Sequence, residues 1–413
     1  MTSYKLYLSW IVSTAFFFYQ YMLRALPSIM SQEIFEIFKI TAEEFSSLGA
    51  IYFMTYGILQ IPIGFLLDRF NVTKIALGAI LFVIAGGLIF GISKDFYMVQ
   101  ISRFILAIGS AAALGITLKI ISSSSEGITR SLLSGITLTV GVLGPILGGE
   151  IVSFILNSND WRVAVIIIGL SGFILFIMSY IFVKNVNHDT NISGFKNIFG
   201  QIRYGFSSSI LTHAIIAGGI YAPVCVFADL WGVRFLSAKF NMSDHNAISV
   251  SLSIYWGLAI GSLILPYISE KINNLHSVTI ISVLINAVLF CIILFSDNLS
   301  LDILYILMIL IGFFCGAEMI CFNAAWRIVP QHCTAIAVGV INSISLIFNA
   351  ILLHCVGLLI DMMWNGNISD EGIRVYSENN YIIGMSLIPL ALFLSFGIGL
   401  VLLRQSKYKH TSC

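Results

Sequence analysis

Two pairs of adjacent acidic and basic residues interrupt strongly apolar stretches of this chain. Asp68 and Arg69 end one stretch, and Glu270 with Lys271 repeats the arrangement in the second half. Opposite charges at helix ends can pair in one conformation and separate in another, and about 0 to 1 kcal/mol is enough to bias two nearly equal states. We therefore expect a conformational gate, with charges that only fix membrane topology as the alternative. The candidate gating residues are Gly64, Asp68, Arg69, Lys74, Glu270 and Lys271.

Arg24 and Arg103 lie inside apolar stretches. A charge near the centre of a bilayer costs at least about 2.5 to 3.5 kcal/mol on insertion scales, so each residue needs a compensating partner. We expect the guanidinium groups to bind a carboxylate or phosphate, or to hold an acidic side chain of the protein. Snorkelling to the membrane surface is the alternative. Gln20 precedes Arg24 by one helical turn, so the two would share a helical face.

A polar and aromatic stripe follows one face of the second apolar stretch, where Tyr52, Tyr56 and Gln60 are spaced by four. Amide groups and aromatic rings at this depth suit a small polar organic solute, although tyrosines in membranes also serve as packing or interface residues. The candidate solute-binding residues are Tyr19, Gln20, Arg24, Tyr52, Tyr56, Gln60, Arg103, Tyr221, Tyr255, Trp256 and Asn342.

Glu318 is the only carboxylate placed well inside an apolar stretch of the second half. A buried carboxyl group can carry a proton through a transport cycle, so we expect Glu318 to couple transport to a proton gradient. A structural partnership with an intramembrane arginine, Asn323 or Asn342 is the alternative. Asp229 and Glu150 fall nearer to the outer ends of their stretches and rank below Glu318 as proton sites.

The composition places these residues in a membrane. Charged residues make up 10% of the chain and hydrophobic residues 58%, and the mean hydropathy is +0.96. A hydrocarbon core of roughly 30 Å takes about 20 apolar residues per helix, and backbone in lipid must satisfy its own hydrogen bonds. We expect an all-α integral membrane protein with twelve transmembrane helices. The predicted spans are 6–28, 45–67, 74–92, 97–118, 131–155, 163–183, 206–229, 247–268, 277–295, 302–325, 335–359 and 381–403.

A polar stretch at 185–204 divides the chain near its middle. It predicts an N-terminal six-helix bundle at 1–184, a cytoplasmic linker at 185–204 and a C-terminal six-helix bundle at 205–413. Lysine and arginine are enriched in alternate short loops, which places both termini in the cytoplasm. The first span is too long for a signal peptide and lacks a cleavage site, so we expect it to stay uncleaved. The expected location is the cell inner (plasma) membrane, as a multi-pass protein.

Patterns of catalytic and metal-binding residues do not occur. The sequence has no phosphate-binding glycine loop, no Ser-His-Asp order and no metal-ligand cluster, so we expect no enzymatic activity and no cofactor, with a proton gradient as the energy source. A formal net charge of +1 does not suggest a nucleic-acid partner. The expected partners are a small-molecule solute, protons and the lipid bilayer, with no obligate protein partner.

Glycines and a proline cluster at 141–149, in the fifth predicted span. Glycine allows close backbone approach, and proline frees a carbonyl group and bends the helix. We expect Gly144, Pro145, Gly148 and Gly149 to serve helix packing.

Together these residues resemble signatures of the major facilitator superfamily of secondary transporters. Its loop signature between helices two and three resembles Gly64, Asp68, Arg69 and Lys74, with Asn71 where that pattern usually has glycine. Arg103 with Gly109 resembles its fourth-helix signature, and the cluster at 141–149 resembles its fifth-helix signature. The resemblance covers essentially the full chain and implies two pseudo-symmetric bundles that expose a central site to each side in turn.

A narrower resemblance is to a bacterial branch that includes the phagosomal-transporter group of nutrient permeases and relatives of the lysosomal dipeptide transporter. The residues that carry it are Tyr52, Tyr56, Gln60, Ile61, Pro62, Gly64, Leu230, Trp231, Gly232 and Val233. This resemblance implies uptake of amino acids, short peptides or nucleosides.

The leading hypothesis is a secondary active transporter that takes up such a nutrient together with protons by alternating access. Proton-driven efflux of a drug or metabolite is the alternative within transport. A non-transporting membrane sensor on the same scaffold is the alternative outside it. The intramembrane arginines favour an anionic or zwitterionic solute.

Overall fold

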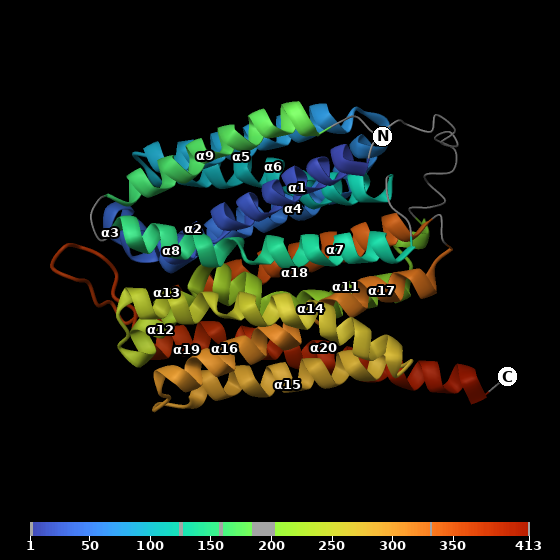
Figure 1. The fold of residues 1–413 in the computed structure, drawn as a ribbon. Coiled ribbons are helices and arrows are strands. Elements are labelled where there is room, and N and C mark those ends of the chain that lie inside the picture. Colours follow the sequence, from blue (N-terminus) through green and yellow to red (C-terminus); the bar gives the residue numbers. More distant parts are fainter. Residues whose placement is uncertain (1–2, 124–126, 157–159, 184–202, 331–332, 412–413) are drawn as a thin grey trace.

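The computed structural model describes residues 3–123, 127–156, 160–183, 203–330 and 333–411, which form a bundle of helices (Figure 1). The first half contains α1 (Ser3–Arg24), α2 (Leu26–Ile29), α3 (Ser31–Phe38), α4 (Ala42–Arg69), α5 (Val72–Ile92), α6 (Phe96–Ser122), α7 (Gly127–Val142), α8 (Gly144–Leu156) and α9 (Trp161–Phe182). The second half contains α11 (Ser208–Ala222), the π-helix η2 (Pro223–Trp231), α12 (Gly232–Phe240), α13 (Asp244–Leu252), α14 (Ile254–Lys271), α15 (Leu275–Phe295), α16 (Leu301–Cys315), α17 (Glu318–Ile328), α18 (Thr334–Met362), α19 (Glu378–Met385) and α20 (Leu387–Thr411). The predicted linker falls almost entirely outside the described residues.

Eleven stretches of the described residues are long and apolar enough to cross a bilayer. They coincide with the second to twelfth predicted spans, and the first predicted span coincides with α1 and α2. Helices of this length bond their backbone groups internally, as a hydrocarbon environment requires. The predicted all-α membrane fold is therefore confirmed.

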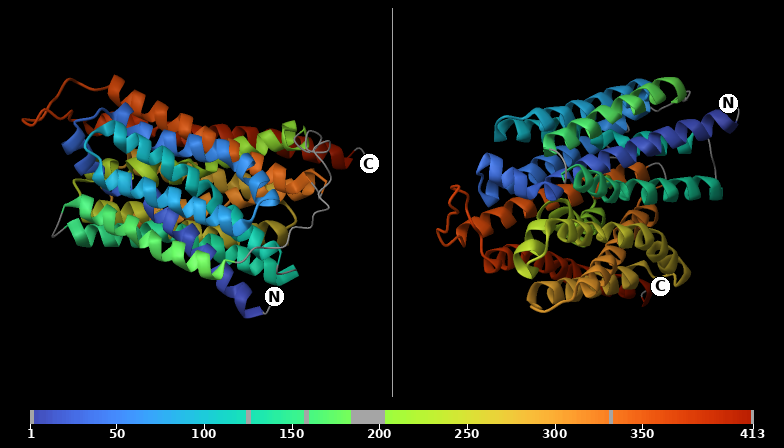
Figure 2. Two further views of the ribbon diagram at one scale, coloured as in Figure 1. Left: turned by 90° about the horizontal axis from the view of Figure 1, so that it is seen from above. Right: turned by 60° about the vertical axis from the view of Figure 1, so that its left-hand side comes forward.

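The two halves of the chain meet along a long interface. Helices α1 to α9 form the upper part of the bundle in Figure 1 and α11 to α20 the lower part, while both termini lie at the same end (Figures 1 and 2). α4 packs along α18 and α7 packs on α14, so both contacts join helices that are far apart in sequence. We call this end the termini end and the opposite end, where α3 and α12 lie, the α3 end.

Some predicted spans are interrupted instead of continuous. The fifth consists of α7 and α8, which meet at Leu143, two residues before Pro145, and the tenth consists of α16 and α17, which meet at Gly316 and Ala317. Proline removes a backbone donor and is a common cause of helix kinks. At Gly316, an added Cβ would collide with the backbone of Gly261 in α14, so only glycine allows this close approach.

The seventh span is longer than predicted. It continues through η2 and α12 to Phe240, and Pro223 begins the π-helical segment. Because proline cannot donate a backbone hydrogen bond, the regular bonding ladder is disturbed there, and π-helical turns are frequent at functional sites. The prediction that the span ends at Asp229 is wrong. At 1.5 Å per residue, Asp229 lies about 16 Å from Phe240 along the helix, well inside the bundle.

Candidate functional site

Arg103 of α6 holds the end of α1 in place. The last carbonyl groups of a helix lack partners within it, and the Arg103 guanidinium donates to the carbonyl oxygens of Leu23 at 3.1 Å and Arg24 at 2.9 Å. Its charge also lies 4.7 Å from the centre of the Tyr52 ring. Arg103 is 2% exposed and Arg24 is 3% exposed, so the snorkelling alternative is wrong for both. The donors of Arg103 thus bond to backbone carbonyl groups, including that of Arg24.

Arg24 pairs with Asp229 of η2, in the other half of the protein. Its Nε donates to Asp229 Oδ2 at 2.9 Å and its terminal nitrogen bonds to the same oxygen, while Tyr255 of α14 donates to Oδ1. Both charged side chains are almost fully buried. Buried charges require a partner because each loses its hydration. We call this contact the cross-half ion pair.

Aromatic rings surround the cross-half ion pair. The Arg24 guanidinium lies 4.8 Å from the ring centre of Tyr21, 4.7 Å from that of Phe53 and 5.6 Å from that of Tyr221. Its terminal nitrogen also donates to the Tyr221 hydroxyl at 3.3 Å. Ring faces attract cations most strongly where water is excluded. Arg24, Tyr221 and Tyr255 are among the residues predicted from the sequence, whereas Asp229 ranks low as a proton site there because the span was predicted to end at it.

Gln20 lies one turn before Arg24 on α1 and is fully buried. Its Oε1 accepts a hydrogen bond from the Tyr52 hydroxyl at 3.1 Å, while its Nε2 has no hydrogen-bond partner among the described residues. Tyr56 lies beside Tyr52, with ring centres 6.0 Å apart. Gln20, Tyr52 and Tyr56 therefore border the cross-half ion pair on the side of the first half.

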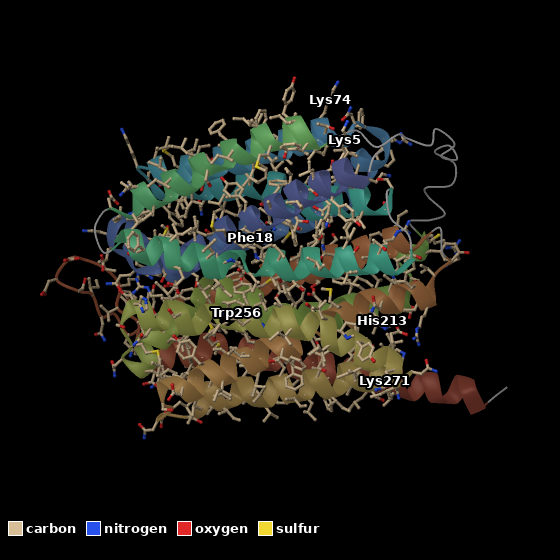
Figure 3. All side chains as sticks on the ribbon, in the orientation of Figure 1. Lys5, Phe18, Lys74, His213, Trp256 and Lys271 are labelled. Carbon is tan, nitrogen blue, oxygen red and sulfur yellow. The ribbon has the colours of Figure 1, made fainter. Side chains whose placement is uncertain are left out.

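Other candidate solute-binding residues lie elsewhere. Tyr19 donates to the carbonyl oxygen of Gly169 in α9 at 2.9 Å, and Gln60 donates to that of Ala111 in α6 at 3.3 Å, so both bond within the first half. Trp256 is 48% exposed and lies on the near face of the bundle in Figure 3. Asn342 is half-buried in α18. The structure does not bring these four residues to the cross-half ion pair.

Glu318 begins α17, directly after the break at Gly316 and Ala317. It is 4% exposed, and Ser345 of α18 donates to its Oε1 at 3.3 Å. Its partner is thus Ser345, instead of Asn323 or Asn342.

Aromatic residues cover the cross-half ion pair toward the α3 end. The Trp231 indole donates to the Ser46 hydroxyl at 2.9 Å across the interface, and its ring lies 5.0 Å from that of Phe45 and 6.4 Å from that of Phe35. The residues of this aromatic seal are Phe35, Phe45, Trp231, Tyr376 and Tyr381. Side chains from both halves therefore block this end of the bundle.

Asp361, at the end of α18, caps the start of α4 across the interface. It accepts from the backbone N–H of Glu43 at 2.7 Å and from that of Ala42 at 3.3 Å. Tyr376 donates to Asp361 at 2.5 Å, and Arg374 bonds to it at 3.1 Å. Burial and the Asp361 carboxylate raise the pKa of Tyr376, so its hydroxyl keeps the proton that it donates. A carboxylate at a helix N-terminus satisfies free N–H groups and complements the helix dipole.

The termini end contains the candidate gating residues. Gly64 in α4 is exposed, and neither its α-carbon nor that of Gly339 in α18 has a neighbour that an added Cβ would touch. Glu270 pairs with Arg327 of α17 at 2.6 Å, within the second half, and the hydrogen bonds described at this end each stay inside one half. The side chain of Asp68 lies outside the described part of the structure.

The basic members of the predicted gate are exposed. The Arg69 guanidinium lies 3.9 Å from the ring centre of Phe65, and the backbone of Lys74 donates to the Asn71 side chain at 3.2 Å. Asn71 therefore serves as the N-cap of α5, a role that asparagine fills better than glycine. Lys74 and Lys271 are both exposed, and Lys74 lies at the upper edge of the bundle in Figure 3.

The glycines of the fifth span face α1. An added Cβ at Gly144 would collide with the carbonyl oxygen of Phe18, and one at Gly148 would collide with Met22. Gly149 instead faces Leu252 of α13, in the other half. Pro145 lies in the first turn of α8, where its missing N–H removes no helical bond.

A small pocket lies apart from these residues, between α11, α15, α17 and α20. It is lined by His213 and His276, whose ring centres are 5.7 Å apart. No group of three or more histidine, cysteine or acidic side chains that could hold a metal ion occurs in the described part of the chain. The residues that line this pocket all belong to the second half and do not include those of the cross-half ion pair.

Comparison with known proteins gives partial matches to two transporters. Over 165 residues the chain is 26% identical to the uncharacterized transporter YybO of Bacillus subtilis, covering 39% of this chain and 37% of that protein. Over 113 residues it is 30% identical to the multidrug efflux pump SdrM of Staphylococcus aureus, covering 26% of this chain and 25% of that protein. The aligned part is thus well under half of each relative.

Solved structures match over nearly the whole chain. A bacterial homologue of the human lysosomal transporter Spinster, in an inward-facing and unoccupied conformation, aligns with a TM-score of 0.79 at 15% identity, covering 97% of both chains. A mutant of the nucleoside transporter NupG aligns with a TM-score of 0.71 at 13% identity, covering 95% of this chain and 99% of that chain. At such identities the likeness shows the fold alone, and the narrower resemblance to nutrient permeases stays a prediction. A family model of the Major Facilitator Superfamily matches residues 12–352, so this chain is a multi-pass membrane transporter of that superfamily.

Proposed function

We propose that this protein takes up a small polar nutrient, such as an amino acid, short peptide or nucleoside, together with protons across the cell inner membrane. The observation that carries the proposal is the cross-half ion pair of Arg24 and Asp229. Buried charges inside a membrane protein are costly and mark solute or ion pathways. In transporters of this architecture the site lies between two halves that move against each other. A charged contact between the halves can therefore respond both to the solute and to the motion.

The unequal ends of the bundle support alternating access. The aromatic seal and Asp361 join the halves at the α3 end, whereas Gly64 and Gly339 face open space toward the termini end. With both termini in the cytoplasm, as the loop charges predict, the closed end faces outward. We therefore take this arrangement to be an inward-facing state, which is the conformation named for the matched Spinster homologue.

Glu318 supports proton coupling. Its carboxyl group is buried and has one hydroxyl partner, Ser345. An ionised carboxylate buried without a directly bonded cation is costly, so a proton that joins and leaves Glu318 during the cycle lowers that cost. Asp229, once separated from Arg24, would face the same requirement.

Export is a second candidate because of one observation. The 113-residue match at 30% identity is to a protein named as a multidrug efflux pump. In an exporter, inward proton flow would drive solute out. The buried Arg24 disfavours cationic drugs as ligands, because a cation placed beside it would be repelled.

Counterflow in proteoliposomes tests the proposal. Purified protein is reconstituted and supplied with pools of labelled amino acids, dipeptides and nucleosides, with and without an inward proton gradient. We expect one pool to exchange in both conditions and to accumulate only with the gradient. The Glu318→Gln variant should retain exchange but lose gradient-driven accumulation. Asp302→Asn, an exposed carboxylate in the first turn of α16, is the matched control.

Two outcomes would contradict the proposal. Lack of exchange of every pool, together with efflux of cationic dyes, would reject nutrient uptake in favour of export. Unchanged accumulation by the Glu318→Gln variant would reject Glu318 as the coupling residue and leave the transport function intact.

A further inference from the structure

We infer that the transported solute is a zwitterion whose carboxylate displaces Asp229 from Arg24 and whose ammonium group then pairs with Asp229. The inference rests on the proposed transport function and narrows its solute class. It starts from the state seen here, in which the positive and negative groups of the protein satisfy each other.

Charge balance selects the solute class. Arg24 is 3% exposed and Asp229 is 3% exposed, so a solute that separates them must replace the partner of each. An uncharged nucleoside would leave both charges unpaired, a simple carboxylic acid would leave Asp229 unpaired, and a cation would leave Arg24 unpaired. A molecule with one carboxylate and one ammonium group leaves neither unpaired.

Gln20 supplies a second donor for the carboxylate. It lies one turn before Arg24 on the same face of α1. Its Nε2 is buried and has no hydrogen-bond partner among the described residues. The Tyr52 hydroxyl donates to Oε1 of the same amide at 3.1 Å, and in this arrangement Nε2 is the free group. A buried donor without a partner is costly, so a carboxylate oxygen that also contacts Arg24 gains from bonding to it.

The side of Asp229 is equally prepared for an ammonium group. Tyr255 of α14 donates to Oδ1, and this bond does not depend on Arg24. When Arg24 turns to the solute, Asp229 remains fixed by Tyr255 and presents Oδ2 to the cation. Arg24 keeps its backbone position because Arg103 holds the carbonyl groups at the end of α1. The site therefore opens by exchanging one contact, with its two charged ends already held.

The same exchange connects binding to movement of the halves. In the structure Arg24 and Asp229 bond directly, which holds α1 and η2 together. With the solute between them, Arg24 and Asp229 each still pair with an opposite charge, but the distance between α1 and η2 must increase. Solute size at this point is therefore limited to what two nearby helices can accommodate, which favours an amino acid or a very short peptide over a long one.

Competition in the counterflow assay tests the inference on the unaltered protein. Exchange of labelled alanine and of labelled alanylalanine is measured. The unlabelled competitors are alanylalanine, its C-terminal amide and its N-acetyl derivative. Uridine serves as the uncharged probe and ethidium as the cationic probe. We expect alanylalanine to compete at least tenfold better than either derivative. Equal competition by the amide or the N-acetyl derivative would overturn the inference.

Two variants separate a binding role from a structural one. Gln20→Ala should raise the KM of the zwitterion about tenfold and leave the maximal rate nearly unchanged, because one neutral donor to a charged group is lost. Asp229→Asn should let N-acetylalanine compete as well as alanine, because the unpaired Arg24 then needs only a carboxylate. Arg162→Lys, at the start of α9 in contact with Ser93, is the control. If Gln20→Ala and Asp229→Asn both abolish competition, and Asp229→Asn does not improve competition by N-acetylalanine, the roles assigned to Gln20 and Asp229 are overturned.

Failure of the inference and failure of the transport function give different results. Exchange of uridine that alanylalanine does not inhibit would overturn the zwitterion class while transport itself stands. Lack of exchange of all probes by folded protein, shown by a single symmetric peak in size-exclusion chromatography, would overturn the proposed function and the inference with it.

Discussion

The α3 end and the termini end of the bundle contrast in how the two halves meet. At the α3 end, Trp231 reaches Ser46 and Asp361 reaches the start of α4, so each half completes bonds of the other. At the termini end, the described ion pair of Glu270 and Arg327 lies within one half. Contacts between halves can change with conformation, whereas contacts within a half move as a unit. The difference indicates which residues report on the transport cycle.

The largest expected effect comes from breaking the cross-half ion pair. Arg24→Met should destabilise the fold by about 3 to 5 kcal/mol, because Asp229 remains buried without a cation. The double variant Arg24→Met with Asp229→Leu should recover most of this loss, since both charges are gone. Thermal unfolding followed by fluorescence measures both. If the double variant is no more stable than the single one, the two residues do not act as a pair.

A smaller effect is expected from the cap at the α3 end. Asp361→Ala should destabilise the state closed at the α3 end by about 0.5 to 2 kcal/mol relative to the open state, because two N–H groups of α4 lose their acceptor. That loss should increase the population open at the α3 end about tenfold. Spin labels at Gln32 and Asp370 measure the distance across this end. Glu371→Ala in the same loop is the control, and equal distance distributions in the two variants would contradict a role for the cap.

A smaller loss of stability is expected from removing a contact midway along the interface. Ser343 of α18 donates to the carbonyl oxygen of Gly57 in α4 at 2.7 Å. Ser343→Ala should cost about 0.5 to 1.5 kcal/mol, the usual net value of one hydrogen bond. Ser386→Ala is the comparison, because the Ser386 hydroxyl donates at 2.6 Å to the carbonyl oxygen of Ile383 in α19, within the same half. Thermal unfolding of the two variants should differ in this direction, and a reversed order would refute the assignment.

The smallest effect is expected within one half at the termini end. Glu270 and Arg327 are about half exposed, and water screens such a pair. Glu270→Gln should change stability by about 0 to 1 kcal/mol, and less in high salt. Unfolding measured at low and high salt tests this. A loss of transport without a loss of stability would instead support the gating role predicted for Glu270.

Long-range hydropathy was sufficient to predict the fold. The apolar windows predict the spans because lipid demands about 20 apolar residues per helix, whatever the helix packs against. The interruptions at Leu143 and Gly316 could be placed only roughly, since a break depends on what the neighbouring helix requires. The extension of the seventh span to Phe240 was missed because Arg234 and Lys239 lower its apolar character.

The site was predictable in its residue types but not in its pairing. An arginine inside a span requires an anion, and the sequence offered Asp229, Glu150 and Glu318 as candidates. Which of them meets Arg24 depends on how the two halves dock and on the π-helical turn after Pro223. A proline six residues before an acid in the same span was the available signal. Likewise, the sequence could not show that Arg103 bonds to backbone. Every residue has a carbonyl group, so the residue types do not reveal which of these groups accept.

At Gly57, midway along the interface, α4 and α18 approach each other closely. An added Cβ there would lie 2.9 Å from the carbonyl oxygen of Ser343, so α4 and α18 touch backbone to backbone at this point. The arms of α4 on either side measure about 22 Å to Ala42 and about 18 Å to Arg69. With arms so nearly equal, tilting one half must spread one end by about as much as it narrows the other. If the halves tilt about Gly57, opening one end closes the other, so that the two ends are not open at the same time.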